Sequence, residues 1–434
     1  MPYILDSKDA DFDSTFEAFL TAKRASQPQV QNTVAQIITQ VRSQGDMALF
    51  ELSKRFDKVA LDDLRLCDKL AEETLTKIEP DVMAALEFAA ERIRAYHERQ
   101  KPQGFDYLDS VGVRLGSRWT AIGAVGLYVP GGTAAYPSSV LMNAIPAQVA
   151  GVERIVMVVP TPNATLNPAV IAAAKISGVK EIYTIGGAQA IAALAYGTQS
   201  IAPVDKIVGP GNAYVAEAKR QVFGQVGIDM IAGPSEIVIL ADGAQNPEWL
   251  AADLLSQAEH DSVAQSILIS DSERLLECCH KALLRQLDVL PRADIARASW
   301  QDFGALIKVN SLDQGCALIE RIAPEHLELA CDNPDFWLGK VRNAGSIFLG
   351  CFTPEPIGDY VAGTNHVLPT MRSARYSSGL TVLEFMKRSS IISCDAQALE
   401  KLGDATVTLA RAEGLEAHAR AVEMRLSGLK IRQV

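Results

Sequence analysis

The fold is decided by a stretch in which short β-rich runs alternate with alanine-rich runs. Residues 181–195 read EIYTIGGAQAIAALA, and residues 206–223 read KIVGPGNAYVAEAKRQVF. Each segment begins with residues that favour strands, turns at glycines, and continues with residues that favour helices. Strands that alternate with helices in this way are typical of a parallel sheet covered by helices. The sequence therefore predicts an α/β fold.

The same alternation extends outward from this stretch. Strands are predicted at Ala124–Val129, Arg154–Val159, Glu181–Ile185, Lys206–Val208 and Glu236–Ala241, and helices at Ser138–Ala150, Pro168–Ser177, Ala188–Ala195 and Ala213–Phe223. A second block has strands predicted at Ser266–Ser270, Leu306–Val309 and Ser346–Leu349. Apolar residues at helical spacing predict that the first hundred residues are mainly helical, as is the tail at 396–428, which is interrupted at Gly414.

Composition and charge narrow the class of protein. The chain has 434 residues, with 41 Lys and Arg against 52 Asp and Glu, so its net charge is −11. Hydrophobic residues make up 48% and charged residues 21%, which together with the length predicts two or three globular domains. An acidic balance without a basic block argues against a nucleic-acid surface and against a basic membrane-binding surface.

Targeting and cysteine patterns favour the cytoplasm. The first residues, MPYILDSKDADFDSTF, are acidic and lack the order of a secretory signal. No run approaches the roughly 18 apolar residues that a membrane span needs. The seven cysteines are an odd number without a C-x-x-C pair, which favours reduced thiols over disulfides or a cysteine-rich zinc site. We therefore expect a cytoplasmic protein without a membrane or nucleic-acid partner.

Three glycine-rich turns follow strands of the first block. They are Tyr128–Gly132, Gly186–Gln189 and Gly209–Asn212. Glycine lets the backbone approach a ligand, and the helix after each turn offers free N–H groups to a phosphate. The chain has no G-x-G-x-x-G fingerprint, so the turns are either tight strand-to-helix connections or a dinucleotide site at the carboxyl ends of the strands.

One segment combines an amide and an imidazole at helical spacing. Gln257 and His260 lie three residues apart, so a helix places them on one face, where they could bind a zinc ion. The alternative is a histidine that caps the end of the helix. Ser235 lacks the partners of a nucleophile and is interpreted as a binding hydroxyl or a cap. His97 is predicted to face solvent, and His280 to be structural.

Three further segments each contain a carboxylate and an imidazole that lie close together in the sequence. Glu325 and His326 are adjacent, and on a loop they could reach one cavity from different sides for two proton transfers, or form a salt bridge. Asp359 and His366 fall in a glycine-punctuated segment, which suggests a rigid functional loop. In the tail, Glu413 and His418 lie five residues apart on either side of Gly414, where a solvated surface is the simplest interpretation.

Taken together, these motifs closely resemble the histidinol dehydrogenase family from about residue 30 to the end. The most specific stretch is IDMIAGPSE at 228–236, followed by AADLLSQAEH at 251–260. Four shorter motifs support it: GGAQA at 186–190, GPGN at 209–212, PEHL at 324–327 and GTNHVLPT at 363–370. Several ordered motifs in one chain are far more specific than any single one.

The resemblance implies an enzyme of histidine biosynthesis that contains zinc and oxidises L-histidinol through L-histidinal to L-histidine with two NAD+. The family's catalytic pair falls on Glu325 and His326. Its metal ligands fall on Gln257, His260, Asp359 and His418. Its substrate contacts fall on Ser235, Gln257, His260, His326, Asp359, Glu413 and His418, with His366 close by, and its NAD contacts on Tyr128, Gln189 and Asn212.

The resemblance also implies an architecture. We expect two incomplete Rossmann-like parallel-sheet domains with helical terminal segments, in an intertwined homodimer whose tail reaches the partner's site. The expected division is 1–25 as an N-terminal segment, 26–127 with 235–376 as the metal and substrate domain, 128–234 as the NAD domain, and 377–434 as the helical tail.

Three rival functions are compatible with parts of the pattern. A metallohydrolase would need a metal-bound water and no dinucleotide. A non-catalytic dinucleotide-binding regulator would leave the Glu325–His326 pair and the metal-type ligands without a purpose. A dehydrogenase of another small diol or amino alcohol is the nearest alternative, since it would use the same scaffold.

Overall fold

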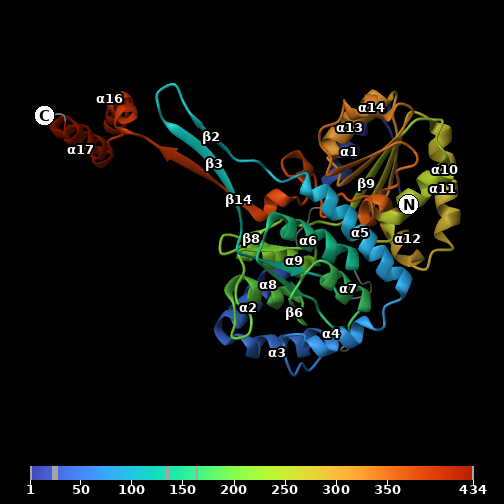
Figure 1. Ribbon diagram of the computed structural model, residues 1–434. Coiled ribbons are helices and arrows are strands. Elements are labelled where there is room, and N and C mark those ends of the chain that lie inside the picture. Colours follow the sequence, from blue (N-terminus) through green and yellow to red (C-terminus); the bar gives the residue numbers. More distant parts are fainter. Residues whose placement is uncertain (1, 22–27, 132–135, 163–164, 433–434) are drawn as a thin grey trace. The chain divides into compact units, whose positions relative to one another are not determined.

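Two compact units make up the chain in the computed structural model, which describes residues 2–21, 28–131, 136–162 and 165–432. The first unit joins Met1–Gln100 to Ile122–Phe385, and the second joins Lys101–Ala121 to Met386–Val434. Figure 1 shows the helices and strands in sequence colours. The mixed α/β fold predicted from the alternating pattern is confirmed.

The first unit contains a six-stranded parallel sheet in the order β1-β11-β10-β9-β12-β13. Its strands are β1 Tyr3–Asp6, β9 Glu236–Ala241, β10 Gln265–Ser270, β11 Ala305–Lys308, β12 His326–Ala330 and β13 Ser346–Leu349. Helices α10 Pro247–Ala258, α11 Glu273–Leu287 and α12 Ala293–Phe303 pack on one face. Helices α1 Phe12–Thr21, α13 Leu312–Ile322 and α14 Pro334–Leu338 pack on the other. Because both faces are covered, β9 and β12 are buried along their whole length.

A second parallel sheet in the same unit has five strands in the order β6-β5-β4-β7-β8. Its strands are β4 Ala124–Tyr128, β5 Arg154–Val158, β6 Glu181–Tyr183, β7 Lys206–Val208 and β8 Gly227–Ile228. The core beside it includes α2 Pro28–Gln44, α3 Asp46–Phe56, α8 Gly187–Tyr196 and α9 Ala213–Val222. A further group of contacting helices comprises α4 Asp68–Leu75, α5 Pro80–Glu98, α6 Pro137–Ala150 and α7 Pro168–Ile176. The unit ends with α15 Glu355–Tyr360, η2 Ser373–Arg375 and η3 Val382–Phe385.

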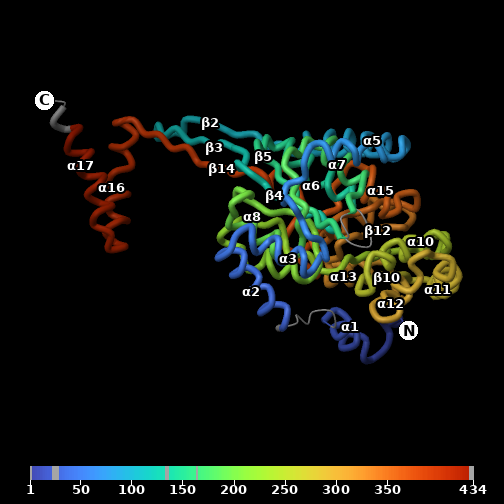
Figure 2. Tube along the Cα trace, turned by 90° about the horizontal axis from the view of Figure 1, so that it is seen from below, coloured from blue at the N-terminus to red at the C-terminus, as the bar shows by residue number. Residues whose placement is uncertain are grey.

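The second unit consists of a small antiparallel sheet and a helical hairpin. Strands β2 Phe105–Leu108, β3 Arg114–Ala121 and β14 Met386–Ser393 pair in the order β14-β3-β2. Helices α16 Ala396–Ala412 and α17 Glu416–Arg432 lie side by side, as the ribbon in Figure 1 and the Cα tube in Figure 2 show. They are joined at Gly414, whose φ of 74° lies in the left-handed region that favours glycine. The predicted break in the helical tail is therefore confirmed.

Several segments of the chain lie in other parts of the fold than the domain boundaries expected from the sequence would place them. Strand β1 forms an edge of the six-stranded sheet and was not predicted, whereas α1 to α5 agree with the prediction that the first hundred residues are mainly helical. Helices α2 and α3 were expected in the metal and substrate domain, but their apolar faces bury Val34 and Leu49 in the core of the five-stranded sheet. The predicted helical tail includes β14, because this strand pairs with β3 over eight residues.

Candidate active site

The site is built around the first residue of β12. His326 is 3% exposed, and its Nδ1 lies 3.1 Å from the backbone oxygen of Glu236 on the neighbouring strand β9. A carbonyl can only accept, so Nδ1 carries the proton and donates it. Nε2 therefore keeps its lone pair, and it has no hydrogen-bond partner among the described residues. This arrangement presents a neutral imidazole whose free nitrogen can act as a base.

Two carboxylates of α15 face this free nitrogen. Glu355 Oε1 and Asp359 Oδ1 each lie 3.7 Å from His326 Nε2. One ligand atom from each of the three residues lies within 4.8 Å of the others, which is close enough to share a metal ion. Asp359 was expected on a loop but lies in a short helix, one turn after Glu355, and the helix directs both side chains to the same place.

Burial dominates the electrostatics of this cluster. Loss of water lowers the pKa of His326 to about 4, although the negative charge of Asp359 opposes the shift. Burial, and then the charge of Asp359, raises the pKa of Glu355 to about 10. At neutral pH, in the absence of a bound cation, His326 is therefore neutral and Glu355 holds a proton.

The C-terminal end of α10 brings Gln257 and His260 to the site. Gln257 is fully buried, and within the described part of the chain neither its amide oxygen nor its amide nitrogen has a hydrogen-bond partner. His260 lies near Asp359, whose charge raises its pKa while burial, the larger effect, lowers it. The helix ends at Ala258, so the expectation that a helix carries both residues is wrong for His260, which lies in the following turn.

Glu325 sits beside the imidazole on the opposite side from α15. Its Oε2 accepts a hydrogen bond of 2.9 Å from the backbone N–H of Glu236 and lies 3.7 Å from His326 Nδ1. The pair was expected on a loop. That holds for Glu325, whereas His326 already belongs to β12, so the strand rather than a loop fixes the direction of its ring.

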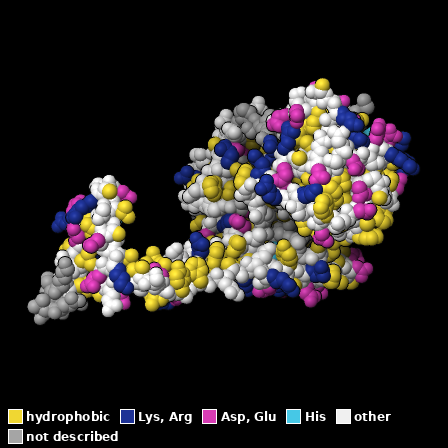
Figure 3. All heavy atoms as spheres, turned by 90° about the horizontal axis from the view of Figure 1, so that it is seen from above, with side chains coloured by type: hydrophobic (Ala, Val, Ile, Leu, Met, Phe, Trp, Pro, Cys, Tyr) yellow, Lys and Arg dark blue, Asp and Glu magenta, His cyan; other side chains and the backbone are white. Residues whose placement is uncertain are grey.

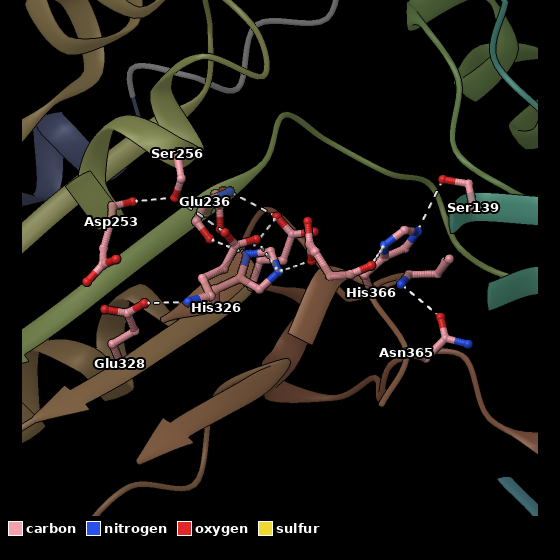
Figure 4. Close-up of polar contacts among 12 residues, drawn as sticks. Ser139, Glu236, Asp253, Ser256, His326, Glu328, Asn365 and His366 are labelled. Atoms are coloured by element: carbon pink, nitrogen blue, oxygen red, sulfur yellow. Dashed lines mark hydrogen bonds and ion pairs between the residues drawn. The ribbon is translucent and has the colours of Figure 1, made fainter. Parts of the chain in front are cut away.

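His366 lies next to this cluster and is held from two sides, as Figure 4 shows. Its Nδ1 donates to the backbone oxygen of Asp359 at 3.0 Å, and its Nε2 lies 3.1 Å from the hydroxyl of Ser139 on α6. The preceding Asn365 donates to the backbone oxygen of Met142, also on α6, at 2.6 Å. Backbone and side-chain contacts thus tie this segment to the second sheet's helices.

His97 does not face solvent as predicted. It is fully buried, its Nδ1 donates to the backbone oxygen of Ile93 at 2.8 Å, and its Nε2 lies 3.4 Å from Asn365 Nδ2. Burial lowers its pKa. The charged neighbours that suggested exposure lie on other faces of α5, and the histidine packs inward against the segment that leads to His366.

The three residues expected to contact a dinucleotide lie where strands of the five-stranded sheet end. Tyr128 closes β4, and its buried hydroxyl accepts a hydrogen bond of 3.1 Å from the N–H of Gly187; burial raises its pKa to about 12. Asn212 caps α9 by accepting from the N–H groups of Tyr214 and Val215. Gln189 is buried in the first turn of α8, which has no side-chain cap.

The remaining predicted residues are placed as follows. Ser235 directly precedes β9, and its backbone oxygen accepts a hydrogen bond from Gln265 N–H. Glu413 ends α16 and His418 lies on α17; both side chains are exposed in the second unit. Gly132, expected in the first glycine-rich turn, lies outside the described residues.

Sequence reasoning missed a row of buried carboxyl groups. Glu355 is 1% exposed, and Glu328 on β12 is 4% exposed. Glu328 accepts a hydrogen bond from the backbone N–H of Glu355, and Asp253 on α10 is hydrogen-bonded to it. An acidic residue inside the apolar strand sequence HLELA was the available sign, because a buried strand seldom carries a carboxylate without a structural or functional reason.

Comparison with known proteins supplies the family. The sequence model of the histidinol dehydrogenase family matches residues 20–426. The chain belongs to the histidinol dehydrogenase family. It is 58% identical over 430 residues to the histidinol dehydrogenase of Rhodospirillum rubrum, covering 98% of this chain and 99% of that protein. It is 59% identical over 425 residues to that of Agrobacterium fabrum, covering 98% of each.

A solved structure of the histidinol dehydrogenase family agrees over nearly the whole chain. The crystal structure of histidinol dehydrogenase from Elizabethkingia anophelis matches with a TM-score of 0.94 at 36% identity, covering 99% of both chains. The described helices include none that is long and apolar enough to cross a membrane. All seven cysteines are free, as their spacing predicted.

Proposed function

We propose that this chain oxidises L-histidinol through L-histidinal to L-histidine with two NAD+, as an enzyme of histidine biosynthesis. Its family and the names of its relatives support the proposal. The observation that carries it is the buried His326, whose tautomer leaves Nε2 free to take a proton beside the carboxyl groups of Glu355 and Asp359.

The residues present fit a zinc ion. A buried side-chain amide is costly when, as for Gln257, it has no partner among the described residues, and its oxygen is an atom that can bind a cation. We propose that Gln257, His260 and Asp359 hold the ion, with His418 of a second copy as the fourth ligand; amide, imidazole and carboxylate atoms are compatible with zinc. When bound, zinc would supply positive charge that polarises and orients the substrate.

The carboxyl edge of the five-stranded sheet fits a dinucleotide. Helix α8 starts at Gly186 and Gly187 without a side-chain cap, so N–H groups of its first turn are available to a phosphate. Tyr128, Gln189 and Asn212 lie at or just after strand ends of this same sheet, the usual ligand edge of open α/β sheets.

In the first oxidation, His326 Nε2 takes the proton of the substrate hydroxyl while a hydride passes to NAD+ from the carbon that bears this hydroxyl. The carbonyl of Glu236 stabilises the resulting imidazolium through the Nδ1 hydrogen bond. Ser235 and His366 are proposed to orient the substrate, since His366 is fixed by Ser139 and by the backbone of Asp359.

In the second oxidation, Glu325 takes a proton from water as the water oxygen bonds to the aldehyde carbon. The imidazolium of His326 returns its proton to the aldehyde oxygen, which completes the hydrate and leaves His326 neutral again. His326 then takes the hydroxyl proton of the hydrate while a second hydride passes to another NAD+. The two adjacent residues therefore serve separate proton transfers, with His326 acting in both. The backbone N–H of Glu236 holds Glu325 in position for its own transfer.

We further propose that the enzyme is a homodimer in which Glu413 and His418 complete the partner's site. Strand β2 is exposed along its whole length, and β14 along nearly all of it. Many of the exposed side chains of the small sheet and the tail helices are apolar, as Figure 3 shows. The larger of them are Phe105, Tyr107, Leu108, Ile392, Leu409 and Met424. Apolar surface on this scale favours coverage by a second copy.

The proposal is tested by following NADH at 340 nm with L-histidinol and the zinc-loaded protein. We expect two NADH per L-histidinol consumed and L-histidine as the product. One NADH per substrate, or higher kcat/KM for another vicinal diol or amino alcohol, would replace this function by that of a related dehydrogenase. Turnover of a hydrolysable substrate without NAD+ would favour a metallohydrolase.

A further inference from the structure

The most specific sequence motif of the chain contains an acidic residue to which the proposed chemistry gives no role. Asp229 follows β8, where its N–H donates to the backbone oxygen of Ile207 at 3.2 Å. Its side chain is 1% exposed and forms an ion pair with Lys219 of α9, whose side chain is 3% exposed. Both charges are buried at the edge of the sheet where the dinucleotide is proposed to bind.

The pair holds the two peptide groups that flank Gly209 in the turn that follows β7. Asp229 Oδ2 accepts a hydrogen bond of 2.8 Å from the N–H of Gly209, and Lys219 Nζ donates one of 3.0 Å to the oxygen of the same residue. Asp229 Oδ1 also accepts from the N–H of Met230 at 2.6 Å. The ion pair therefore closes a loop around Gly209 and fixes its backbone on both sides.

The backbone conformation of Gly209 that the ion pair fixes is one that favours glycine. Gly209 has a φ of 110°, and a Cβ atom there would lie 2.1 Å from the backbone oxygen of Tyr128. The turn thus presses against the end of β4 and directs the chain into Asn212, three residues on, which caps α9. Tyr128 and Asn212 are two of the three proposed dinucleotide contacts, and Gly209 sets the spacing between them.

Burying two charges is expensive, and apolar side chains could fill the same space at lower cost. Such a pair is retained for stability only where its geometry is very good, but it can also specify one conformation of the backbone. Here the two charges contact the backbone of the turn from opposite directions, which apolar side chains could not do.

We propose that Lys219 and Asp229 are positioning residues for NAD+, because they hold the 209–212 turn in the shape that presents Asn212 to the dinucleotide. The inference rests on the proposed function. Neither residue touches the reacting atoms, so their effect should fall on dinucleotide affinity and not on proton transfer.

The test compares two neutralised ion pairs of the same sheet. The variant Lys219→Met with Asp229→Asn removes both charges and the donor to Gly209 O, while the asparagine still accepts from Gly209 N–H. The matched control is Arg154→Met with Glu181→Gln. Arg154 and Glu181 pair at 3.0 Å, and Arg154 also donates to two backbone oxygens, but this pair lies at the amino ends of β5 and β6, away from the turn.

Calorimetry should give a dissociation constant for NAD+ at least about tenfold higher in the Lys219/Asp229 variant, as expected for losing one strong hydrogen bond. The control should bind NAD+ as the unchanged protein does. Zinc content and the KM for L-histidinol should be unchanged in both variants. An NAD+ affinity within about twofold of the unchanged protein, or equal weakening in the control, would overturn the inference.

A measurement on the unchanged protein covers the case in which the double variant does not fold. NAD+ should slow amide hydrogen exchange in peptides spanning residues 209–219 and leave peptides around Arg154 unaffected. Absence of protection at 209–219 in protein that binds NAD+ would overturn the positioning role alone. Absence of any NAD+ binding would instead overturn the proposed function.

Discussion

The hydroxyl of Ser139 lies 3.1 Å from Nε2 of His366 and joins helix α6, which packs beside the five-stranded sheet, to the segment that follows α15. Because Nδ1 of His366 donates to the backbone oxygen of Asp359, Nε2 accepts a hydrogen bond from the hydroxyl of Ser139. The ring is thus held in one tautomer and one orientation by groups from both parts of the first unit.

Replacing Ser139 with Ala should therefore raise the KM for L-histidinol. Loss of one neutral hydrogen bond that orients a substrate contact is worth about 1 kcal/mol, or roughly fivefold in KM. The KM for NAD+ should change less. Ser177→Ala is the matched control, since Ser177 is equally buried but bonds only to backbone oxygens of its own helix. An unchanged KM for L-histidinol in Ser139→Ala would contradict the orienting role.

Glu325 and His326 should separate the two oxidations. His326→Asn removes the base for both, so we expect losses of about 10²-fold or more with L-histidinol and with L-histidinal. Glu325→Gln keeps an oxygen to accept from Glu236 N–H but cannot take a proton from water, so it should mainly slow the oxidation of L-histidinal. Single-turnover NADH formation from each substrate measures the two steps, and equal losses in both steps for Glu325→Gln would refute the division.

Sequence periodicity predicted the architecture better than it predicted the site's local structure. Strands β4, β5, β9 and β10 follow the predicted ranges closely, because buried parallel strands are short apolar runs bounded by turns. Strand β12 was missed, since its sequence HLELA combines charged and apolar residues in the middle of a sheet. Burial of His326 and Glu328 there depends on neighbouring strands that are distant in sequence.

The contacts within the site could not be predicted from a local sequence pattern. The partners of His326 come from β9 and α15, and those of His366 come from α6 and α15, which lie far apart along the chain. Sequence motifs marked Glu325, His326 and Asp359 as candidates, but no spacing rule indicated Glu355. Likewise, the buried position of His97 follows from the packing of α5 and could not be read from its charged neighbours.

Gln257→Met should have opposite effects on the metal-free and the zinc-loaded protein. Each buried polar atom without a partner costs about 1–3 kcal/mol, so replacing the amide with a thioether of similar size should stabilise the metal-free protein by that order. The same variant should bind zinc more weakly, because it loses a ligand. Denaturant unfolding with chelator and with excess zinc measures both effects, and destabilisation in chelator would show that the amide has a partner in the metal-free state.

Mixed dimers test whether His260 and His418 of different chains share one site. A dimer that combines a His260→Asn chain with a His418→Asn chain would contain one intact site and one doubly altered site, so it should show about half of the normal activity. Dimers purified through two different tags, both carrying His260→Asn, serve as the control and should remain inactive. If confirmed mixed dimers are also inactive, each site takes both histidines from one chain.

Asp253→Asn should stabilise the protein at neutral pH but not in acid. Burial raises the pKa of Asp253 from 3.8 to about 6, and its hydrogen bond with Glu328 only partly opposes this. The folded state therefore binds the proton more tightly than the unfolded state does.

The cost of ionising Asp253 is absent below pH 4, grows between pH 4 and 6, and reaches at most about 3 kcal/mol above pH 6. An asparagine escapes this cost, and its amide oxygen can still accept from the protonated carboxyl group of Glu328. The gain in the free energy of unfolding over the unchanged protein should therefore appear as the pH rises through this window. Urea unfolding at pH 4 and pH 7 measures it, with Asp302→Asn on the exposed face of α12 as the control. A gain of equal size at both pH values would contradict a titration of Asp253 as its cause.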